Sequence, residues 1–458
     1  MTNVTAQFSF KPLLISFTIP LRWSITPFFD LLDWSVVPER DECRAWPGSL
    51  PHPQRAYIKA LLVKINEGLE YATRLRRFLV THPALVIELG FRPMADPTQP
   101  FGFAVESTVP CDRHLRRKLQ TFENAVLQRL LDGTVGVLRS EVPDWGNSIA
   151  MDVKHIYAWV RENNPREHIP HRFDPVRQPH GDPDCKLGVK ESHNQGQTVP
   201  RGDPVTVSNA AADKPAKRET KEYLWGYGTG ITAARHPEHG EFVVAEETRT
   251  FEQHDSRYFF SLMAQTETRG GGGPKRFTAD AAFDAWYIYE YIRNAGGKAY
   301  IPLNTHGFAA PTFGPQGQHL CPAGYEMVRA YQYYDRTRGY HAEVEKCPLL
   351  FGAAKSTAAC PVQHPQFAKG VGCVKYRNLE LGAHLRVTLD RQSEEYDTAY
   401  DDRTAAERIN SQAKAHGIER PKLRRMSGIR NQNTLIYIVI NLKAIQRVRA
   451  AKAQARSP

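Results

Sequence analysis

Apolar residues recur at helical spacing through most of the first third of the chain. Within residues 55–80, and again within 113–138, they fall three or four positions apart, the spacing of an amphipathic helix. A shorter helix is expected at Pro83, because proline is tolerated in a first helical turn. We therefore predict a helical N-terminal domain over residues 1–145. Its helices carry Arg and Lys, so it is a candidate DNA-binding domain, although amphipathic helices also form simple bundles.

From residue 147 the pattern changes to short apolar runs that predict strands. The first run, 147–160, predicts a buried strand with one aspartate inside it, Asp152. Two further strands, 221–234 and 240–251, are expected to be joined by a turn. A strand, a helix and a strand then follow at 276–280, 282–296 and 299–304. Such strand–helix–strand units are typical of α/β folds.

Two stretches follow neither pattern. Residues 165–218 are polar and rich in Pro, Gly, Asp and His, so we expect a mobile insertion within the first part of the core, 146–304. Asp182 and Asp184 fall in that insertion and are left out of any site. Residues 305–380 are expected to form an irregular insertion that contains four of the seven cysteines.

The last part of the chain is expected to complete the core and then extend from it. Residues 381–440 complete the core with a helix, and 441–458 form a basic C-terminal helix or tail. The net charge of the 458 residues is +11, and residues 403–458 hold 13 Lys or Arg and 2 Asp or Glu, which accounts for the whole excess. A basic excess at one end indicates a polyanion, most simply nucleic acid, or else a solvated tail. The cations of the last helix expected to follow phosphates are Lys443, Arg447, Arg449 and Lys452.

Length and cysteine usage favour a multi-domain protein of a reducing cytoplasm. The chain is too long for one ordinary core, and no apolar run approaches the roughly 18 to 20 residues of a membrane span. The apolar N-terminal segment is interrupted by charged residues and prolines and does not resemble a signal peptide. Seven cysteines are an odd and modest number, which argues against a secreted disulfide framework. No membrane association is predicted.

The stretch Tyr400–Lys414 carries the most specific signal. On a helix turning about 100° per residue, Arg403 and Glu407 lie about 40° apart, and Glu407 and Lys414 about 20° apart. A solvated ion-pair ladder has the same pattern and contributes a few tenths of a kcal/mol per pair. However, Tyr400, Arg403, Glu407 and Lys414 together resemble the Tyr-(2)-Arg-(3)-Glu-(6)-Lys signature of DDE transposases from a large group of bacterial insertion sequences. All four residues stand at the required intervals.

That resemblance implies an α/β fold with an RNase H-like catalytic core, and two aspartates upstream that lie at or near strands. Asp152 is similar to the first acidic position and Asp280 to the second, with Asp284 as its competitor four residues on. The implied catalytic residues, and the ligands of two Mg²⁺ or Mn²⁺ ions, are Asp152, Asp280 and Glu407. Carboxylate oxygens suit these ions, and two ions about 3.5 to 4 Å apart assist an in-line displacement at phosphorus. The implied DNA contacts are Tyr400, Arg403 and Lys414.

The function implied by the resemblance is cleavage of double-stranded DNA at transposon ends and transfer of the freed 3′-hydroxyl to target DNA. A homodimer that joins two ends, located with the bacterial nucleoid, is the natural form of such an enzyme. One alternative is a metal-dependent nuclease that cleaves DNA without joining it. Another is a DNA-binding derivative of a transposase that has lost catalysis.

The cysteines of the second insertion raise a separate possibility. Four thiolates suit tetrahedral Zn²⁺, which stabilises segments that lack a core. No pair here has the usual spacing of two to four residues, so ordinary reduced thiols are the alternative interpretation. The candidate zinc ligands are Cys321, Cys347, Cys360 and Cys373.

Overall fold

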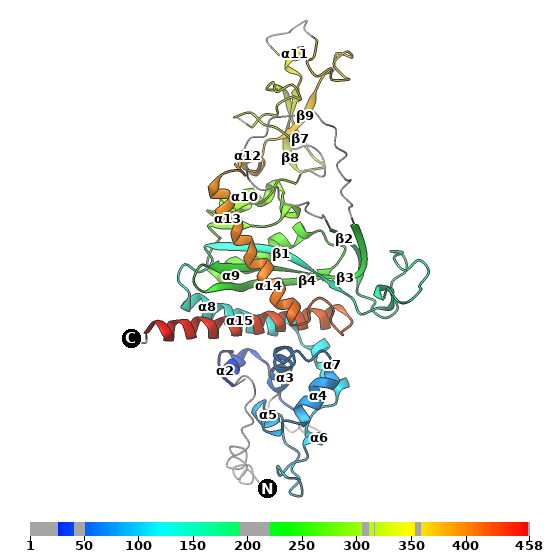
Figure 1. The fold of residues 1–458 in the computed structure, drawn as a ribbon, viewed down its shortest axis with the longest axis vertical. Coiled ribbons are helices and arrows are strands. Elements are labelled where there is room, and N and C mark those ends of the chain that lie inside the picture. Colours follow the sequence, from blue (N-terminus) through cyan, green and yellow to red (C-terminus); the bar gives the residue numbers. More distant parts are fainter. Residues whose placement is uncertain are drawn as a thin grey trace, which may run out of the picture.

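The computed structural model describes residues 26–40, 51–192, 220–304, 311–315, 317–352 and 359–456. Along its longest axis the chain forms three tiers (Figure 1). Short N-terminal helices occupy one end, a mixed sheet with its covering helices lies in the middle, and a smaller sheet forms the other end. The described part is thus a mixed α/β protein, in agreement with the α/β class expected from the sequence.

The central sheet combines antiparallel and parallel strands. Strand β1 pairs antiparallel with β3, which also pairs antiparallel with β2 and β4. On its other side β1 pairs parallel with β5, and β5 pairs parallel with β6. The strands are β1 (Ser148–Tyr157), β2 (Lys186–Ser192), β3 (Thr220–His236), β4 (Gly240–Thr250), β5 (Arg276–Thr278) and β6 (Lys298–Tyr300). Apart from β2, each lies where an apolar run predicted a strand.

The two faces of this sheet are covered by different helices. Ala150, on β1, belongs to a core with helices α14 (Thr404–Ala415) and α15 (Met426–Arg456). Its neighbour Met151 faces the other core, with helix α9 (Phe259–Gly270), because side chains alternate along a strand. A Cβ at Gly230, on β3, would approach the Tyr258 ring within 2.6 Å, so this glycine permits close packing of the segment before α9.

The described residues before β1 form helices, of which α8 lies alongside α15 and not in the N-terminal tier (Figure 1), and each long helix that we predicted is divided in two. The segment 55–80 breaks at Gly68, whose φ of +63° favours glycine, and 113–138 breaks at Phe122. The resulting helices are α3 (Gln54–Asn66), α4 (Ala72–Val80), α7 (Asp112–Thr121) and α8 (Asn124–Glu141). The shorter elements are α2 (Thr26–Phe29), η2 (Trp34–Val36), α5 (Pro83–Glu88) and α6 (Val105–Thr108).

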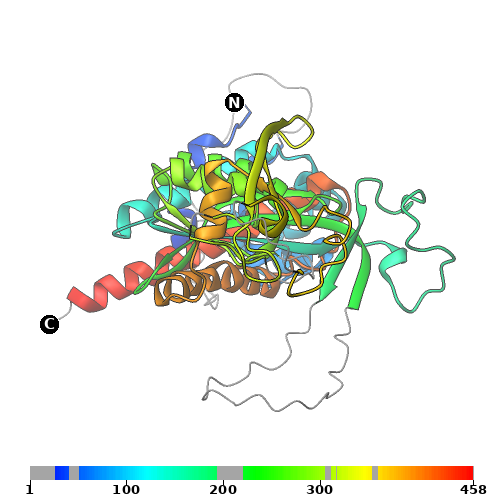
Figure 2. The ribbon, with the colours of Figure 1, turned by 90° about the horizontal axis from the view of Figure 1, so that it is seen from above.

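Helix α15 runs through the molecule between the sheet and the N-terminal helices (Figure 1). Residues 441–456, expected to form a basic helix or tail, continue this helix, and only its last turns project from the body (Figure 2). Its buried polar side chains bind neighbouring elements: Asn441 accepts a hydrogen bond from Val243 N at 2.9 Å and donates to Val243 O at 2.9 Å. Although α15 is long, no helix in the described ranges is both long and apolar enough to cross a membrane.

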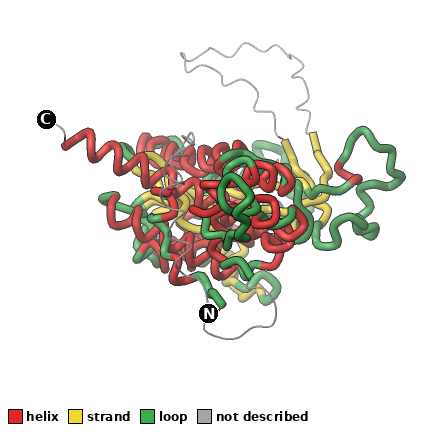
Figure 3. The backbone as a smooth tube through the Cα atoms, turned by 90° about the horizontal axis from the view of Figure 1, so that it is seen from below, coloured by secondary structure: helices red, strands yellow, loops and turns green. Residues whose placement is uncertain are grey.

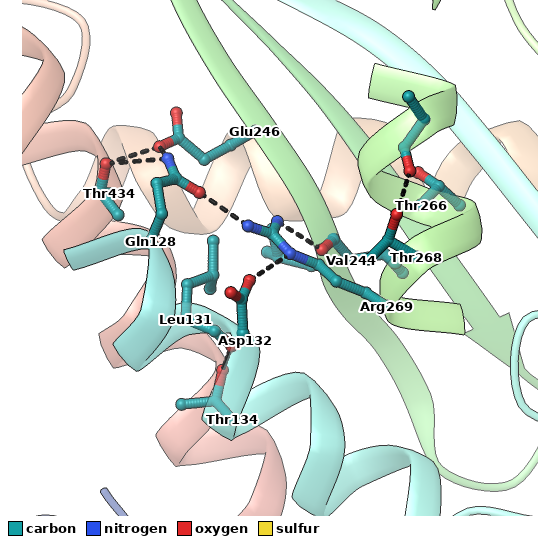
Figure 4. Close-up of polar contacts among 12 residues, drawn as sticks. Gln128, Leu131, Asp132, Thr134, Val244, Glu246, Thr266, Thr268, Arg269 and Thr434 are labelled. Atoms are coloured by element: carbon teal, nitrogen blue, oxygen red, sulfur yellow. Dashed lines mark hydrogen bonds and ion pairs between the residues drawn. The ribbon is translucent and has the colours of Figure 1, made fainter. Parts of the chain in front are cut away.

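A polar cluster ties α15 to α8, β4 and α9 (Figure 4). The Glu246 carboxylate on β4 accepts from Thr434 Oγ1 and from Gln128 Nε2, each at 2.5 Å. Arg269, at the end of α9, donates to Gln128 Oε1 at 2.8 Å and pairs with Asp132 at 2.5 Å. Four elements from three separate parts of the chain are therefore joined by one network of hydrogen bonds.

The insertion expected within the core has an ordered first part. Residues 165–192 are described and end in β2, while 193–218 lie outside the described residues. Loop segments with the short helix η3 (Arg161–Asn163) extend from one side of the body (Figure 3). Asp182 is fully buried and accepts a hydrogen bond from Tyr227 Oη at 2.8 Å. Polar contacts therefore attach residues 165–192 to the core, and the amino-acid composition of the segment does not reveal such contacts.

The Cys-containing insertion is not irregular throughout, and that part of the expected fold class was wrong. It holds an antiparallel sheet of β7 (Val328–Asp335), β8 (Tyr340–Lys346) and β9 (Val374–Asn378). The outer strands β7 and β9 are largely exposed, so they lack the apolar alternation of a half-buried strand. Polar cross-strand contacts take its place, including one from Gln332 to Glu343 at 2.9 Å.

The remaining helices lie after β4 and around the insertion. Asp284, which we expected inside a helix, precedes α10. These elements are η4 (Asp255–Tyr258), η5 (Ala281–Phe283), α10 (Trp286–Asn294), α11 (Pro348–Phe351), α12 (Leu381–Thr388), α13 (Glu394–Tyr400) and η6 (Asp401–Arg403).

Candidate functional site

Two parallel strands bring Asp152 and Asp280 together. In the pairing of β1 with β5, Ala150 lies opposite Thr278, and each aspartate stands two residues beyond its member of that pair. Asp280 follows the end of β5 and accepts a hydrogen bond from Ala282 N at 3.0 Å, which caps η5. The aspartates, far apart in sequence, are thus neighbours at the end of the parallel pair.

Helix α14 crosses the same face of the sheet and contacts β1, β3 and β4. Its buried face carries small residues, including Ala406 and Ala413, which allow the helix to approach the strands closely. One turn after Glu407, Asn410 donates from Nδ2 to Asp152 Oδ2 at 2.9 Å. This contact fixes the position of the glutamate-bearing helix relative to the first aspartate.

A second anchor stands just before α14. The buried Asp402 carboxylate pairs with Arg235 of β3 at 2.9 Å and with Arg276 of β5 at 3.1 Å. It also accepts a hydrogen bond from Ser148 Oγ of β1 at 2.5 Å. Asp402 therefore attaches the signature segment to three strands, and Arg403 and Glu407 follow directly from this fixed point.

Three of the four signature residues lie together. The Arg403 guanidinium pairs with the Glu407 carboxylate and stands 5.8 Å from the centre of the Tyr400 ring. Tyr400 stacks on Tyr396, with ring centres 5.5 Å apart. The Glu407 side chain is 52% exposed, so this ion pair lies at the surface.

Lys414 lies two turns along α14 and pairs elsewhere. Its Nζ stands 3.0 Å from the Glu419 carboxylate, which also faces Lys154 at 3.7 Å. Lys414 therefore faces the turn between α14 and α15 rather than the aspartates.

Burial and mutual repulsion perturb the carboxyl groups of this site. Burial raises the pKa of Asp152 to about 6, and the nearby Asp280 adds to the rise while Arg403 opposes it. The pKa of Asp280 is also raised, mainly by burial. Close carboxylates resist joint ionisation, and a cation between them removes that cost.

A third aspartate, Asp255, lies near Asp152 and Asp280 and was not expected from the sequence. Burial raises its pKa to about 7, and both Asp280 and Asp152 contribute. It begins η4, which contacts the η5 segment after Asp280. No spacing rule connects "HDSRY" with the signature, so only the fold reveals this neighbour.

Asp284 has a different environment from Asp280. Its side chain is fully buried, and its two oxygens accept from Arg386 Nε at 2.8 Å and Nη2 at 2.6 Å. Asn304 N donates to the same carboxylate at 2.7 Å. Both carboxylate oxygens of Asp284 are therefore engaged in a buried ion pair with Arg386.

The donor set suits a hard divalent cation, but it is not assembled as a cage. Carboxylate oxygens are the ligands that Mg²⁺ prefers, and the crowding of Asp152 and Asp280 is of the kind that a cation relieves. Glu407 is occupied by Arg403. Across the described ranges, no three Asp, Glu, His or Cys side chains lie close enough to one point to hold a metal ion as they stand. Metal binding at this site stays a prediction.

The four candidate zinc ligands are all buried in the smaller tier. Cys321, Cys347 and Cys373 share one small core with Met327, and every described cysteine is a free thiol. Burial raises the pKa of Cys373 to about 11, and the other three thiols add to the rise. The fold thus gathers these cysteines although no pair has the usual zinc spacing, and zinc itself stays a prediction.

The cations of the last helix are less available than we expected. Arg449 pairs with Glu141 of α8 at 2.8 Å, and Lys452 Nζ donates to the Glu141 backbone oxygen at 2.5 Å. Lys443 is partly buried and stands 3.3 Å from His416 Nε2. Arg449, Lys452 and Lys443 of this helix thus contact other residues of the same chain.

Comparisons with known proteins give little beyond this geometry. No family model and no curated protein matches the sequence. Among solved structures, a piggyBac transposase in a synaptic complex with hairpin DNA is similar over 98% of this chain and 82% of its own, with 9% identity and a TM-score of 0.33. That similarity is too distant to assign a fold or a function, so the proposal below rests on the site residues.

Proposed function

We propose that this protein is a DDE transposase of the insertion-sequence type with an RNase H-like core. It binds the inverted repeats at transposon ends, cleaves DNA there and transfers the 3′-hydroxyl to target DNA. The observation that carries the proposal is the position of the signature helix. Asn410, on that helix, donates a hydrogen bond to Asp152 at 2.9 Å, and the same helix carries Glu407 one turn earlier.

The carboxylates would hold two Mg²⁺ or Mn²⁺ ions through Asp152, Asp280 and Glu407. Such ions, when bound, activate the attacking oxygen and stabilise the leaving one. In the chain itself, Arg403 balances the charge of Glu407 and presents a guanidinium fork suited to a phosphate. Asn410 orients Asp152, and Asp402 fixes the start of the signature segment against the sheet.

The remaining parts of the proposal concern partners. Tyr400, Arg403 and Lys414 would contact the DNA at the transposon end. A homodimer would hold two ends, since both must be joined to one target. The protein would act where bacterial DNA lies, in the nucleoid of the cytoplasm.

The test uses purified full-length protein, labelled DNA that carries the element's own ends, and a supercoiled target, with Mg²⁺ or with EDTA. The proposal predicts cleavage and joined products that require the metal and are lost in Glu407→Gln. Arg408→Gln, the adjacent exposed position, is the matched control and should retain both activities. Cleavage without joining would establish a nuclease instead. Binding of the ends without cleavage in any divalent metal would contradict catalysis and favour a DNA-binding derivative.

A further inference from the structure

A cleft lined by cations from two distant parts of the chain lies beside the signature helix. It forms where α7 meets the beginning of α15 and has a volume of about 480 Å³. We name it the arginine cleft after its cations: Arg113, Arg116, Arg117, Lys422, Arg424 and Arg425. No acidic side chain from the described residues lines it, and of its cations Arg116 pairs with Asp112 beside it at 3.2 Å.

The fold constrains the turn that supplies half of these cations. Arg425 has a φ of +73°, a left-handed conformation that is unfavourable for a residue with a Cβ. The buried carboxylate of Asp182 accepts from Arg425 N at 3.2 Å, and Asp184 accepts from Met426 N at 2.9 Å. The insertion before β2 therefore holds this turn in place.

Further contacts fix the neighbouring side of the cleft. Gln120 of α7 donates to the Arg424 backbone oxygen at 3.4 Å. The Arg424 guanidinium covers the Trp159 ring at 5.0 Å and donates to the Trp159 backbone oxygen at 3.3 Å. Trp159 remains 42% exposed, so an aromatic surface adjoins the cations.

The cleft is continuous with the signature helix. A second hollow of about 200 Å³ is lined by the cations Lys414, Arg420 and Lys422 and by one acidic residue, Glu70. A third of about 330 Å³ is lined by Trp159, Arg420 and Arg424 and by one acidic residue, Glu167. Shared residues connect all three hollows. A cationic path thus leads from the last signature residue, past the turn 416–425, to the N-terminal helices.

Like charges gathered in this way repel one another unless an anion neutralises them. A solvated basic face does not require a strained turn that is held by a buried aspartate. We propose that the arginine cleft binds the phosphodiester backbone of a nucleic acid strand. The identification of that strand as DNA rests on the proposed function. The cleft would guide the DNA from the carboxylate site toward α7, a role that we had assigned to the cations of the last helix.

The test measures binding of full-length protein to a fluorescein-labelled DNA duplex of about 30 base pairs by anisotropy over a range of salt concentrations. The cleft variant carries Arg113→Gln, Arg117→Gln and Lys422→Gln. The control variant carries Arg293→Gln, Arg336→Gln and Lys369→Gln, three exposed cations outside the cleft with the same total change in charge. Circular dichroism establishes that both variants are folded.

We expect the cleft variant to bind at least about tenfold more weakly, and the slope of log K against log salt to fall by about three. The control should stay within about twofold of wild type. Equal weakening of both variants, or wild-type affinity of the cleft variant, would overturn the inference. An RNA duplex of the same sequence serves as a second probe, and stronger binding of RNA would contradict DNA as the strand.

The outcome is separable from that of the proposed function. Glu407→Gln removes a carboxylate outside the arginine cleft, so it should abolish cleavage and leave duplex affinity unchanged. If wild type never cleaves DNA but the cleft variant still loses affinity, the proposed function fails and the cleft remains a nucleic-acid site. If wild type cleaves and joins DNA while the cleft variant binds the duplex normally, the proposed function stands and the inference about the arginine cleft fails.

Discussion

Asn410 on α14 donates a hydrogen bond of 2.9 Å to Asp152 on β1, and this contact joins the signature helix to the first aspartate. Asn410 is buried, and among the described residues its Oδ1 has no hydrogen-bond partner. Asn410→Ala should therefore free the Asp152 carboxylate to rotate. We expect about 10- to 100-fold slower metal-dependent cleavage and a higher Mg²⁺ requirement, as when residues that orient metal ligands are lost.

Gln412→Ala is the control for that prediction. Gln412 lies on the same helix but donates to Glu241 at 2.8 Å, away from Asp152. Its loss should leave the Mg²⁺ dependence unchanged. Similar Mg²⁺ titration curves for Asn410→Ala and wild type would show that Asn410 does not position Asp152.

Asp280 and Asp284 should separate activity from stability. Asp280→Asn removes a charge disfavoured by burial and leaves an oxygen that can still cap η5, so the melting temperature should not fall while cleavage is lost. Asp284→Ala breaks a buried pair with Arg386 and should cost about 3 to 5 kcal/mol in the free energy of unfolding. Urea unfolding and the cleavage assay measure the two effects. An active Asp280→Asn protein would remove Asp280 from the site.

Local patterns in the sequence mark strands and helices directly, and from them we predicted two strand-associated aspartates and a signature helix. The fold makes neighbours of Asp152 and Asp280. Glu407 pairs with Arg403, and its place in one site with the aspartates stays a prediction. Asp255, Asn410 and Asp402 were missed, since their roles arise from contacts between segments far apart in the chain. The structure of residues 165–192 was missed for a related reason, because buried Asp182 is held by polar contacts with distant segments.

The buried Glu246 predicts a pH-dependent stability (Figure 4). Burial raises its pKa from 4.5 to about 7, so the folded state binds the proton more tightly than the unfolded state. The resulting stability is complete below about pH 4.5 and is lost as the pH rises through about 7. Glu246→Gln should reduce this dependence by at most about 3 kcal/mol above neutral pH, and the part contributed by the raised pKa values of Asp152 and Asp255 should remain.

Urea unfolding at about pH 5 and pH 8 measures that difference. Glu252→Gln, at an exposed position, should keep the pH dependence of wild type. An unchanged pH dependence in Glu246→Gln would assign the effect to another group.

We propose that the four cysteines gathered in the smaller tier bind zinc. Protein purified under reducing conditions should contain about one zinc ion per chain by elemental analysis. Cys347→Ser and Cys373→Ser should lose the ion, and Cys111→Ser, at an exposed thiol outside the cluster, should keep it. Zinc-free wild-type protein, or equal zinc in all variants, would leave the cysteines as ordinary core thiols.

We propose that Asp152, Asp280 and Glu407 form one metal-binding site. The number of Mn²⁺ ions bound per chain, measured by electron paramagnetic resonance with end-bearing DNA present, tests this site directly. We predict about two ions for wild type and for Asp284→Asn, and fewer for Asp152→Asn and Glu407→Gln. The same number of ions in all four proteins would contradict the claim.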